Sequence, residues 1–193
     1  TVGMRWTGLL IPPGATVTAA WIQFTAEEAR SETTSVLIQG QAADNATTFT
    51  STNGNLNATA RPRTGAGVPW IPPAWTGGGQ AGAAQRTPDL KAIVQEIVGR
   101  PGWANGNALV LIVTGTGRRN ALSFDGNAAQ APLLHVESNG APAPTAPVSA
   151  TQLPTPALTV RADGSGSQPG SGGAIASYRF DWGDGTAATT TTA

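Results

Sequence analysis

The stretch QRTPDLKAIVQEIVGRPGWANGNALVLIVT, residues 85–114, decides the fold because it joins the clearest helix of the chain to its most apolar strand. Thr87 is a favourable N-cap residue, and Asp89 complements the positive end of the helix that would follow it. Gly99 is typical of a helix end. These three signals predict a helix over residues 88–98.

One face of this predicted helix is apolar, and a strand follows the helix. Lys91, Gln95 and Glu96 occupy the other face and are expected to face water. Residues 108–113 form a continuous apolar run, short enough for a strand that is buried on both faces. The helix is therefore expected to cover a sheet with side chains that recur at the spacing of one helical face: Leu90, Ile93, Val94, Ile97 and Val98.

Most of the remaining chain alternates apolar and polar residues, which is typical of strands. Residues 44–79 are instead rich in Gly, Pro and Asn and predict a long loop that is packed by Trp70 and Trp75. The expected fold class is all-β with one amphipathic helix. The alternation predicts strands over residues 2–6, 15–25, 35–41, 122–124 and 133–137.

The composition excludes several classes of protein. The 193 residues contain 11 Lys and Arg against 11 Asp and Glu, so no net charge attracts nucleic acid or an anionic membrane. The longest apolar runs have about six residues, whereas a membrane-spanning helix needs roughly 20. We therefore expect neither nucleic-acid binding nor membrane insertion.

The chain contains no Cys, which fits either a reduced cytosol or an exported protein that avoids thiols. Its surplus of Thr, Ser, Asn, Gly and Ala over Lys and Glu is typical of exported bacterial surface proteins. The expected location is therefore the bacterial cell surface or the extracellular space.

Proline marks a domain boundary. Residues 139–157 contain five prolines among small residues, which is typical of an extended, stiff linker. The sequence predicts a first domain over residues 1–138, a linker over 139–147 and the start of a second domain over 148–193. This last region is short for a free-standing core, so the second domain is expected to be incomplete.

The second region contains DGSGS at residues 163–167 and IASYRFDWGDG at residues 175–185. These segments resemble the hallmark of the PKD domain (polycystic kidney disease repeat), a D-G-S/A-G-S turn before a strand of the form Y-x-W-D-F-G-D-G. Here Phe180 and Trp182 exchange the usual aromatic order. The resemblance covers residues 148–193 and implies the first half of an Ig-like β-sandwich. In that family the domain is an extracellular spacer or adhesion module, not an enzyme.

Residues 1–137 resemble the jelly-roll domains that repeat in secreted bacterial proteins. The resemblance implies a jelly-roll β-sandwich that lacks its first strands. It also implies kinship with carbohydrate-binding modules, from which sugar binding is an expectation. The shared motifs are RWTG at residues 5–8, IPPGAT at 11–16, PAW at 73–75, RTPDL at 86–90 and RPGW at 100–103.

Three tryptophans are candidate ligand-binding residues, because aromatic rings stack on the faces of sugars. They are Trp70, Trp75 and Trp103. The favoured alternative is that these rings cover the hydrophobic edge of the sandwich under the long loop.

Oxygen-rich loops offer candidate ligands for a structural Ca²⁺ ion, which binds hard oxygen atoms from loops. Ordinary solvated loops are the alternative. The candidate metal ligands are Glu27, Glu28, Asp44, Asp125 and Asn127.

No residue pattern indicates catalysis. His135 is the sole histidine, lies in a predicted strand and is expected to be structural. Because Cys and a second His are missing from the sequence, a zinc site is not expected. Asp181 and Asp184 lie around a strand end, where they are expected to stabilise turns rather than to form an acid pair.

The sequence is compatible with two alternative functions. In the first, the chain is a structural or adhesive unit, such as a subunit of a surface fibre, and other protein chains add strands to its open sheet edges. In the second, the chain is a carbohydrate-binding accessory module of a larger secreted enzyme and binds a polysaccharide. The expectation that both domains are incomplete favours the first function.

Overall fold

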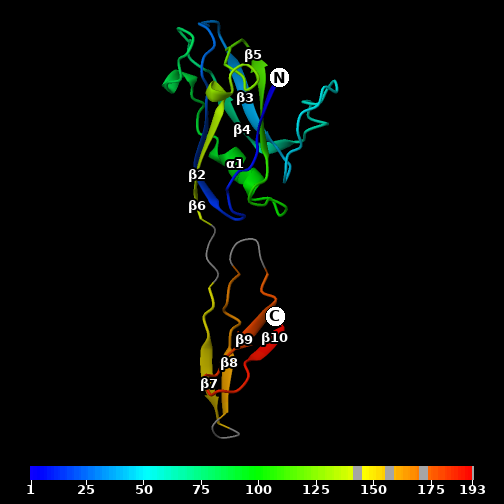
Figure 1. The fold of residues 1–193 in the computed structure, drawn as a ribbon, viewed down its shortest axis with the longest axis vertical. Coiled ribbons are helices and arrows are strands. Elements are labelled where there is room, and N and C mark those ends of the chain that lie inside the picture. The colour runs from blue at the N-terminus through cyan, green and yellow to red at the C-terminus, as the bar shows by residue number, and fades with distance from the viewer. Residues whose placement is uncertain (141–144, 155–158, 170–173, 193) are drawn as a thin grey trace. The chain divides into compact units, whose positions relative to one another are not determined.

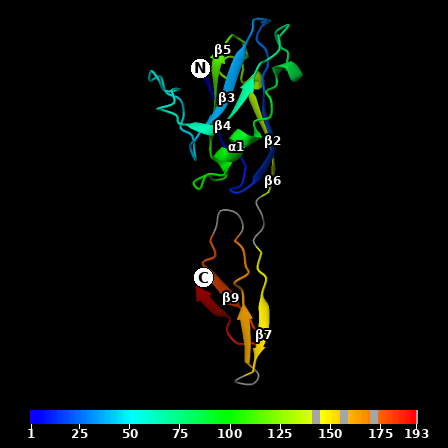
Figure 2. The ribbon, with the colours of Figure 1, turned by 180° about the vertical axis from the view of Figure 1, so that it is seen from behind.

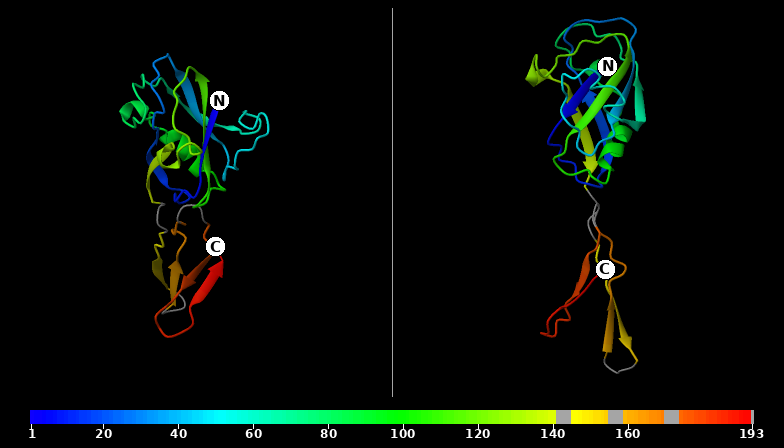
Figure 3. Two further views of the ribbon diagram at one scale, coloured as in Figure 1. Left: turned by 45° about the horizontal axis from the view of Figure 1, so that its top comes forward. Right: turned by 90° about the vertical axis from the view of Figure 1, so that its right-hand side faces the viewer.

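The computed structural model describes residues 1–140, 145–154, 159–169 and 174–192. The chain forms two compact units, Thr1–Gly140 and Ala141–Ala193, and each is described by itself (Figure 3). Of the predicted linker over 139–147, residues 141–144 lie outside the described residues.

The first unit contains two antiparallel sheets and one α-helix, which confirms the all-β class (Figures 1 and 2). The larger sheet has the order β1-β5-β3-β4 and the smaller one pairs β2 with β6. The inner faces of both sheets and one face of the helix form a single core. The elements are β1 (Val2–Trp6), β2 (Thr16–Gln23), β3 (Ser35–Gln41), β4 (Arg63–Trp70), α1 (Lys91–Val98), β5 (Leu109–Thr116) and β6 (Leu133–Asn139).

The strand predicted from the apolar run is β5, and it is buried on both faces as expected. Leu109 and Leu111 point into the core between the sheets. Val110 and Ile112 point to the other side, where Ala46 covers them from the long loop. Because β5 lies between β1 and β3 in the sheet, its backbone is also paired on both edges.

The predicted start of the helix was wrong, and the cause is the edge of β2. α1 begins at Lys91 rather than at residue 88. The Thr87 hydroxyl accepts a hydrogen bond from the Ile22 N–H (3.0 Å), and the Asp89 carboxylate accepts one from the Ala20 N–H (3.0 Å). Two of the residues expected to begin the helix therefore bind β2.

The polar face of the helix faces water as predicted at Lys91 and Glu96, whereas Gln95 is half-buried. The Gln95 side chain accepts a hydrogen bond from the Val17 N–H (2.8 Å), at the start of β2. The Glu96 carboxylate accepts hydrogen bonds from the N–H groups of Gly65 and Ala66 (2.8 Å each), in β4. Thus α1, which lies beside β2 and β4 (Figure 1), packs its apolar face into the core, and its Gln95 and Glu96 side chains bind one strand of each sheet.

The long loop predicted over residues 44–79 is interrupted by β4, a strand that the sequence pattern did not predict. This strand reads RTGAGVPW, with three small residues and a proline in place of large apolar ones. A strand at residues 122–124 was also predicted wrongly, since there only Ala121 makes an isolated bridge to Ala26.

The first part of the long loop is held by a buried arginine rather than by tryptophan. Arg61 is only 2% exposed, and its side chain donates to the backbone oxygens of Thr47, Thr48 and Asn55 at 2.8–3.0 Å. It also donates to the side chains of Gln41 and Asn55. The guanidinium lies 4.5 Å from the ring centroid of Phe49, which packs on the outer face of β5. The Arg61 side chain thus holds the first part of the long loop against the sheet, because it binds backbone carbonyl groups of the loop.

The described residues of the second unit form two two-stranded antiparallel sheets. In one, β7 (Ser149–Leu153) pairs with β8 (Thr159–Asp163); in the other, β9 (Ser177–Phe180) pairs with β10 (Thr189–Thr192). Thr145 and Gln168 form an additional bridge.

The buried hydrogen bond between Thr87 and Ile22 can be used to test whether residues 87–90 bind the edge of β2. Thr87→Val keeps the shape of the side chain but leaves the buried Ile22 N–H without an acceptor, so the free energy of unfolding should fall by about 1–3 kcal/mol. Urea denaturation followed by tryptophan fluorescence measures the change. Thr87→Ser, which keeps the acceptor, is the matched control; an equal loss in both variants contradicts the role of the hydroxyl.

Asp89 provides a second test through pH. Partial burial raises the pKa of its carboxyl group, but hydrogen bonds from the Ala20 and Lys91 amides and the Lys91 charge outweigh burial and hold this pKa below its ordinary value of 3.8. A lowered folded-state pKa means that the ionised group stabilises the fold above the ordinary pKa. This contribution is lost as the pH falls through the lowered value.

The stability difference between the wild type and Asp89→Asn should therefore be constant between about pH 5 and 7 and shrink below about pH 4. Denaturation curves across this range measure the difference. A difference that is independent of pH down to unfolding contradicts a role for the ionised carboxylate.

Candidate functional site

The structure places two of the three candidate tryptophans in the core. Trp75 is 2% exposed and its indole N–H donates to the Ala84 carbonyl (2.9 Å). Trp103 is 3% exposed and donates to the Ile11 carbonyl (2.9 Å). Trp70 is half-buried, with its ring stacked 5.9 Å from that of Phe24. The three rings do not form a shared platform, and a glycan would meet solvent-accessible surface only at Trp70.

The candidate calcium ligands lie in three separate loops, and two of them already bind arginine. Glu28 forms an ion pair with Arg30 (2.6 Å), and Asp44 forms one with Arg100 (2.6 Å). The remaining three candidates, Glu27, Asp125 and Asn127, are exposed. Among the residues that the structure describes, no three acidic or His side chains form a group that could hold a metal ion. An ion at Glu28 or Asp44 would have to displace an arginine.

His135 takes part in a stack of side chains on the outer face of β2 and β6. Its ring lies 3.8 Å from that of Trp21, on the neighbouring strand, and its Nε2 lies 3.1 Å from the Glu137 carboxylate. The Arg86 guanidinium lies 4.9 Å from the Trp21 ring centroid. His135 thus packs on a neighbouring ring and lies beside a carboxylate on the outer face of β2 and β6.

The aspartates of the last segment stabilise turns, as predicted. Asp181 accepts a hydrogen bond from the Gly183 N–H (3.0 Å), and Asp184 accepts from the N–H and hydroxyl of Thr186 (2.9 and 2.6 Å). The bonds from Thr186 lower the pKa of Asp184. Gly183 and Gly185 have φ values of 69° and 82°, which L side chains rarely adopt, so the tight turn requires glycine here.

The sheet edges of the first unit differ in how they are covered. On one side of the unit, the side chains of Thr87, Asp89 and Gln95 bind the edge of β2. The Glu96 side chain binds the edge of β4 on the same side. The other two terminal strands are β1 and β6. Within the described residues, β1 pairs only with β5, and β6 pairs only with β2. Trp6, at the end of β1, donates from its indole N–H to the Pro132 carbonyl just before β6 (3.1 Å).

The core side chains of β1 and β6 are less buried than those of the neighbouring strands β2 and β5. Ile22 in β2 and Leu111 in β5 are fully buried at 0% exposure. The side chains that β1 and β6 direct into the core are only partly buried: Met4, Trp6, Leu134 and Val136. We call this set of side chains, with the free edges of β1 and β6, the open side of the first unit. The sequence predicted open sheet edges but not which strands carry them, because strand order cannot be read from alternation alone.

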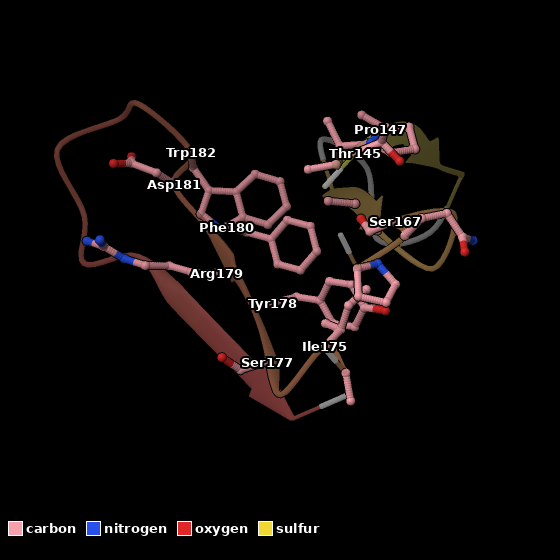
Figure 4. Close-up of a pocket in the computed structure, with 18 residues that line it drawn as sticks. Thr145, Pro147, Ser167, Ile175, Ser177, Tyr178, Arg179, Phe180, Asp181 and Trp182 are labelled. Carbon is pink, nitrogen blue, oxygen red and sulfur yellow. The ribbon is translucent and has the colours of Figure 1, made fainter. Parts of the chain in front are cut away.

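The second unit has an open groove of about 940 Å³ lined mainly by apolar residues (Figure 4). Tyr178, Phe180 and Trp182 direct their rings into it from β9 and the residue pair that follows, whereas Arg179 points away. Successive ring centroids are 6.4 and 6.3 Å apart. Trp182 and Val148, both in the lining, are 44% and 63% exposed. The unit therefore presents a sheet face whose apolar residues are incompletely covered.

Comparison of the chain with protein-family models, with curated protein sequences and with solved structures found no match in any of the three. Within the described residues, no helix has the length and apolar character needed to cross a bilayer.

The calcium prediction has a direct test. A chain that holds Ca²⁺ in its folded state melts at a higher temperature with calcium than with EGTA, because an ion that binds only the folded state stabilises it. Differential scanning calorimetry in the two buffers measures the shift, and Asp44→Asn removes one candidate ligand as a control. The same transition in both buffers contradicts a calcium site.

Proposed function

We propose that this chain is a non-catalytic structural or adhesive module of the bacterial cell surface or extracellular space, which joins other protein chains by strand addition. We further propose that the first unit is a jelly-roll-like sandwich and that the second is the beginning of a PKD-like sandwich. The observation that carries the proposal is the open side of the first unit, where two neighbouring strands combine free edges with partly buried core side chains.

The contrast between the two sides of the first unit supports strand addition. A free edge presents unpaired N–H and C=O groups, and proteins usually protect such edges with charges, bulges or covering segments. This chain covers β2 and β4 with hydrogen-bonding side chains, so its sequence contains the means of edge protection. An incoming strand at β6 would gain backbone hydrogen bonds and bury apolar side chains at the same time.

The groove of the second unit supports the same proposal. Tyr178 and Phe180 contribute their rings from β9 and Trp182 follows that strand, while the lining also contains Ala150 of β7 and the preceding Val148. An added strand would cover these residues in the manner of a missing sandwich strand. Both units thus have apolar surface that extra strands would bury.

The alternative is glycan binding by an accessory module of a larger secreted enzyme, and it rests on the jelly-roll resemblance. Burial of Trp75 and Trp103 removes two of the candidate stacking rings, and Trp70 has one neighbouring ring already stacked against it. The structural observations therefore favour assembly over glycan binding.

The proposal predicts self-association or assembly of the purified protein. Sedimentation velocity at increasing protein concentration should show a growing fraction of species larger than the monomer, and negative-stain microscopy shows whether these are discrete or fibrous. A protein that stays monomeric at micromolar concentration and is retained on a polysaccharide column contradicts the proposal and favours the alternative.

A further inference from the structure

The hydrogen-bonding groups on the free edge of β6 can be identified from the bonds made by β2. Ala20 and Ile22 use both N–H and C=O toward residues 87–90, on the side of β2 away from β6. In an antiparallel pair, residues alternate between facing the partner and facing away. Val136 is opposite Ala20, and Leu134 is opposite Ile22. The free groups of β6 are therefore the N–H and C=O of Leu134 and Val136.

The side chains of β6 divide between two faces. Leu134 and Val136 pack against the core, although they remain partly exposed. His135 and Glu137 lie on the outer face, where His135 stacks on Trp21. A strand that pairs with the free edge would thus extend the core on one face and meet an imidazole and a carboxylate on the other.

We propose that the occupant of this edge is a second copy of the chain, with the two β6 strands pairing antiparallel about a two-fold axis at Val136. This inference rests on the proposed function and specifies its partner and register. The two-fold axis places Val136 opposite Val136 of the second copy, and Leu134 opposite Ser138. Both are pairs of residues whose backbone groups face outward, so the two strands can exchange hydrogen bonds.

Strand length selects this register. β6 runs over Leu133–Asn139, and Val136 is its central residue. Pairing about Val136 overlaps the whole strand, with Leu133 of one copy opposite Asn139 of the other. Shifting the axis to a neighbouring residue leaves residues unpaired at both ends and forfeits backbone hydrogen bonds.

Side-chain pairing on the outer face favours the same register. Pairing about Val136 puts His135 of each copy opposite Glu137 of the other, where each imidazole can hydrogen-bond a carboxylate of the other copy. An axis at His135 would place the two His135 side chains opposite each other. An axis at Glu137 would oppose two carboxylates, which is unfavourable. The arrangement is isologous, as expected for a two-fold dimer.

The second copy also covers apolar surface that the single chain leaves open. The β2–β6 ribbon would become a four-stranded sheet, with Leu134 and Val136 no longer at its margin. Met4 and Trp6, on β1, lie on the same open side and would face the joined core. Each copy would thus bury the exposed apolar side chains on the open side of the other.

A charge-reversal experiment tests the partner and the register together. Glu137→Lys places Lys opposite His135 of the second copy and should weaken the dimer roughly tenfold, because two hydrogen-bonded pairs across the interface are lost. The double variant His135→Glu with Glu137→Lys places opposite charges in both pairs and should return the dissociation constant to the wild-type value or below. Sedimentation equilibrium measures the dissociation constants, and thermal melts confirm that the variants fold.

A backbone variant tests the edge without using charge. Val136→Pro removes an N–H that points away from β2, so the pairing within the chain is kept and proline is tolerated at such an edge position. This variant should be monomeric. Asn53→Ala, at an exposed position of the long loop, is the control for an unrelated substitution and should leave the monomer–dimer equilibrium unchanged.

The outcomes separate this inference from the proposed function. If the wild type self-associates and the β6 variants associate equally well, pairing through β6 is overturned while assembly stands. If the wild type is monomeric but binds a different protein chain, the second copy is overturned as the occupant and strand addition stands. Weakening by the single reversal and the proline, with recovery in the double reversal, supports the proposed register.

Discussion

The structure of the first unit depends on how the hydrogen-bonding groups at its sheet edges are satisfied. A sheet strand that lacks a neighbour must pair its N–H and C=O groups with side chains, water or another chain. Residues 85–96 meet this requirement for two strands at once: Thr87, Asp89 and Gln95 bind β2, and Glu96 binds β4. The helix α1 therefore connects the two sheets by its polar face as well as by its apolar one.

Residues 85–96 cover the first unit on the side of β2 and β4. The opposite, open side is the one to which the proposed function is assigned. The open side has no covering segment among the described residues, and its core side chains lose burial toward β1 and β6. A free strand edge offers directional hydrogen bonds to an added strand, and a partly covered core offers apolar area that the added strand can bury. The two features together favour binding more than either does alone. The groove of the second unit likewise leaves apolar side chains exposed, among them Val148 and Trp182.

Sequence patterns predicted the parts of the fold that depend on local periodicity. The apolar stripe of α1 and the doubly buried β5 were predicted correctly because each pattern reflects which faces are covered. β4 was missed because its small residues carry no alternation of size, and its place in the sheet is set by pairing with β3. Of the candidate site residues, Trp75 and Trp103 proved to be core residues, since an aromatic ring looks the same in sequence whether it is buried or exposed.

The sequence by itself determined the all-β class, the single amphipathic helix and the apolar faces of its main elements, because hydrophobic periodicity is a local property of the chain. Only the tertiary structure decided that Thr87 and Asp89 bind β2 instead of beginning the helix, and that Arg61 closes the long loop. It alone also showed that β1 and β6 end their sheets on the same side. These features depend on contacts between residues far apart in the chain, and such contacts leave no periodic signal in the sequence.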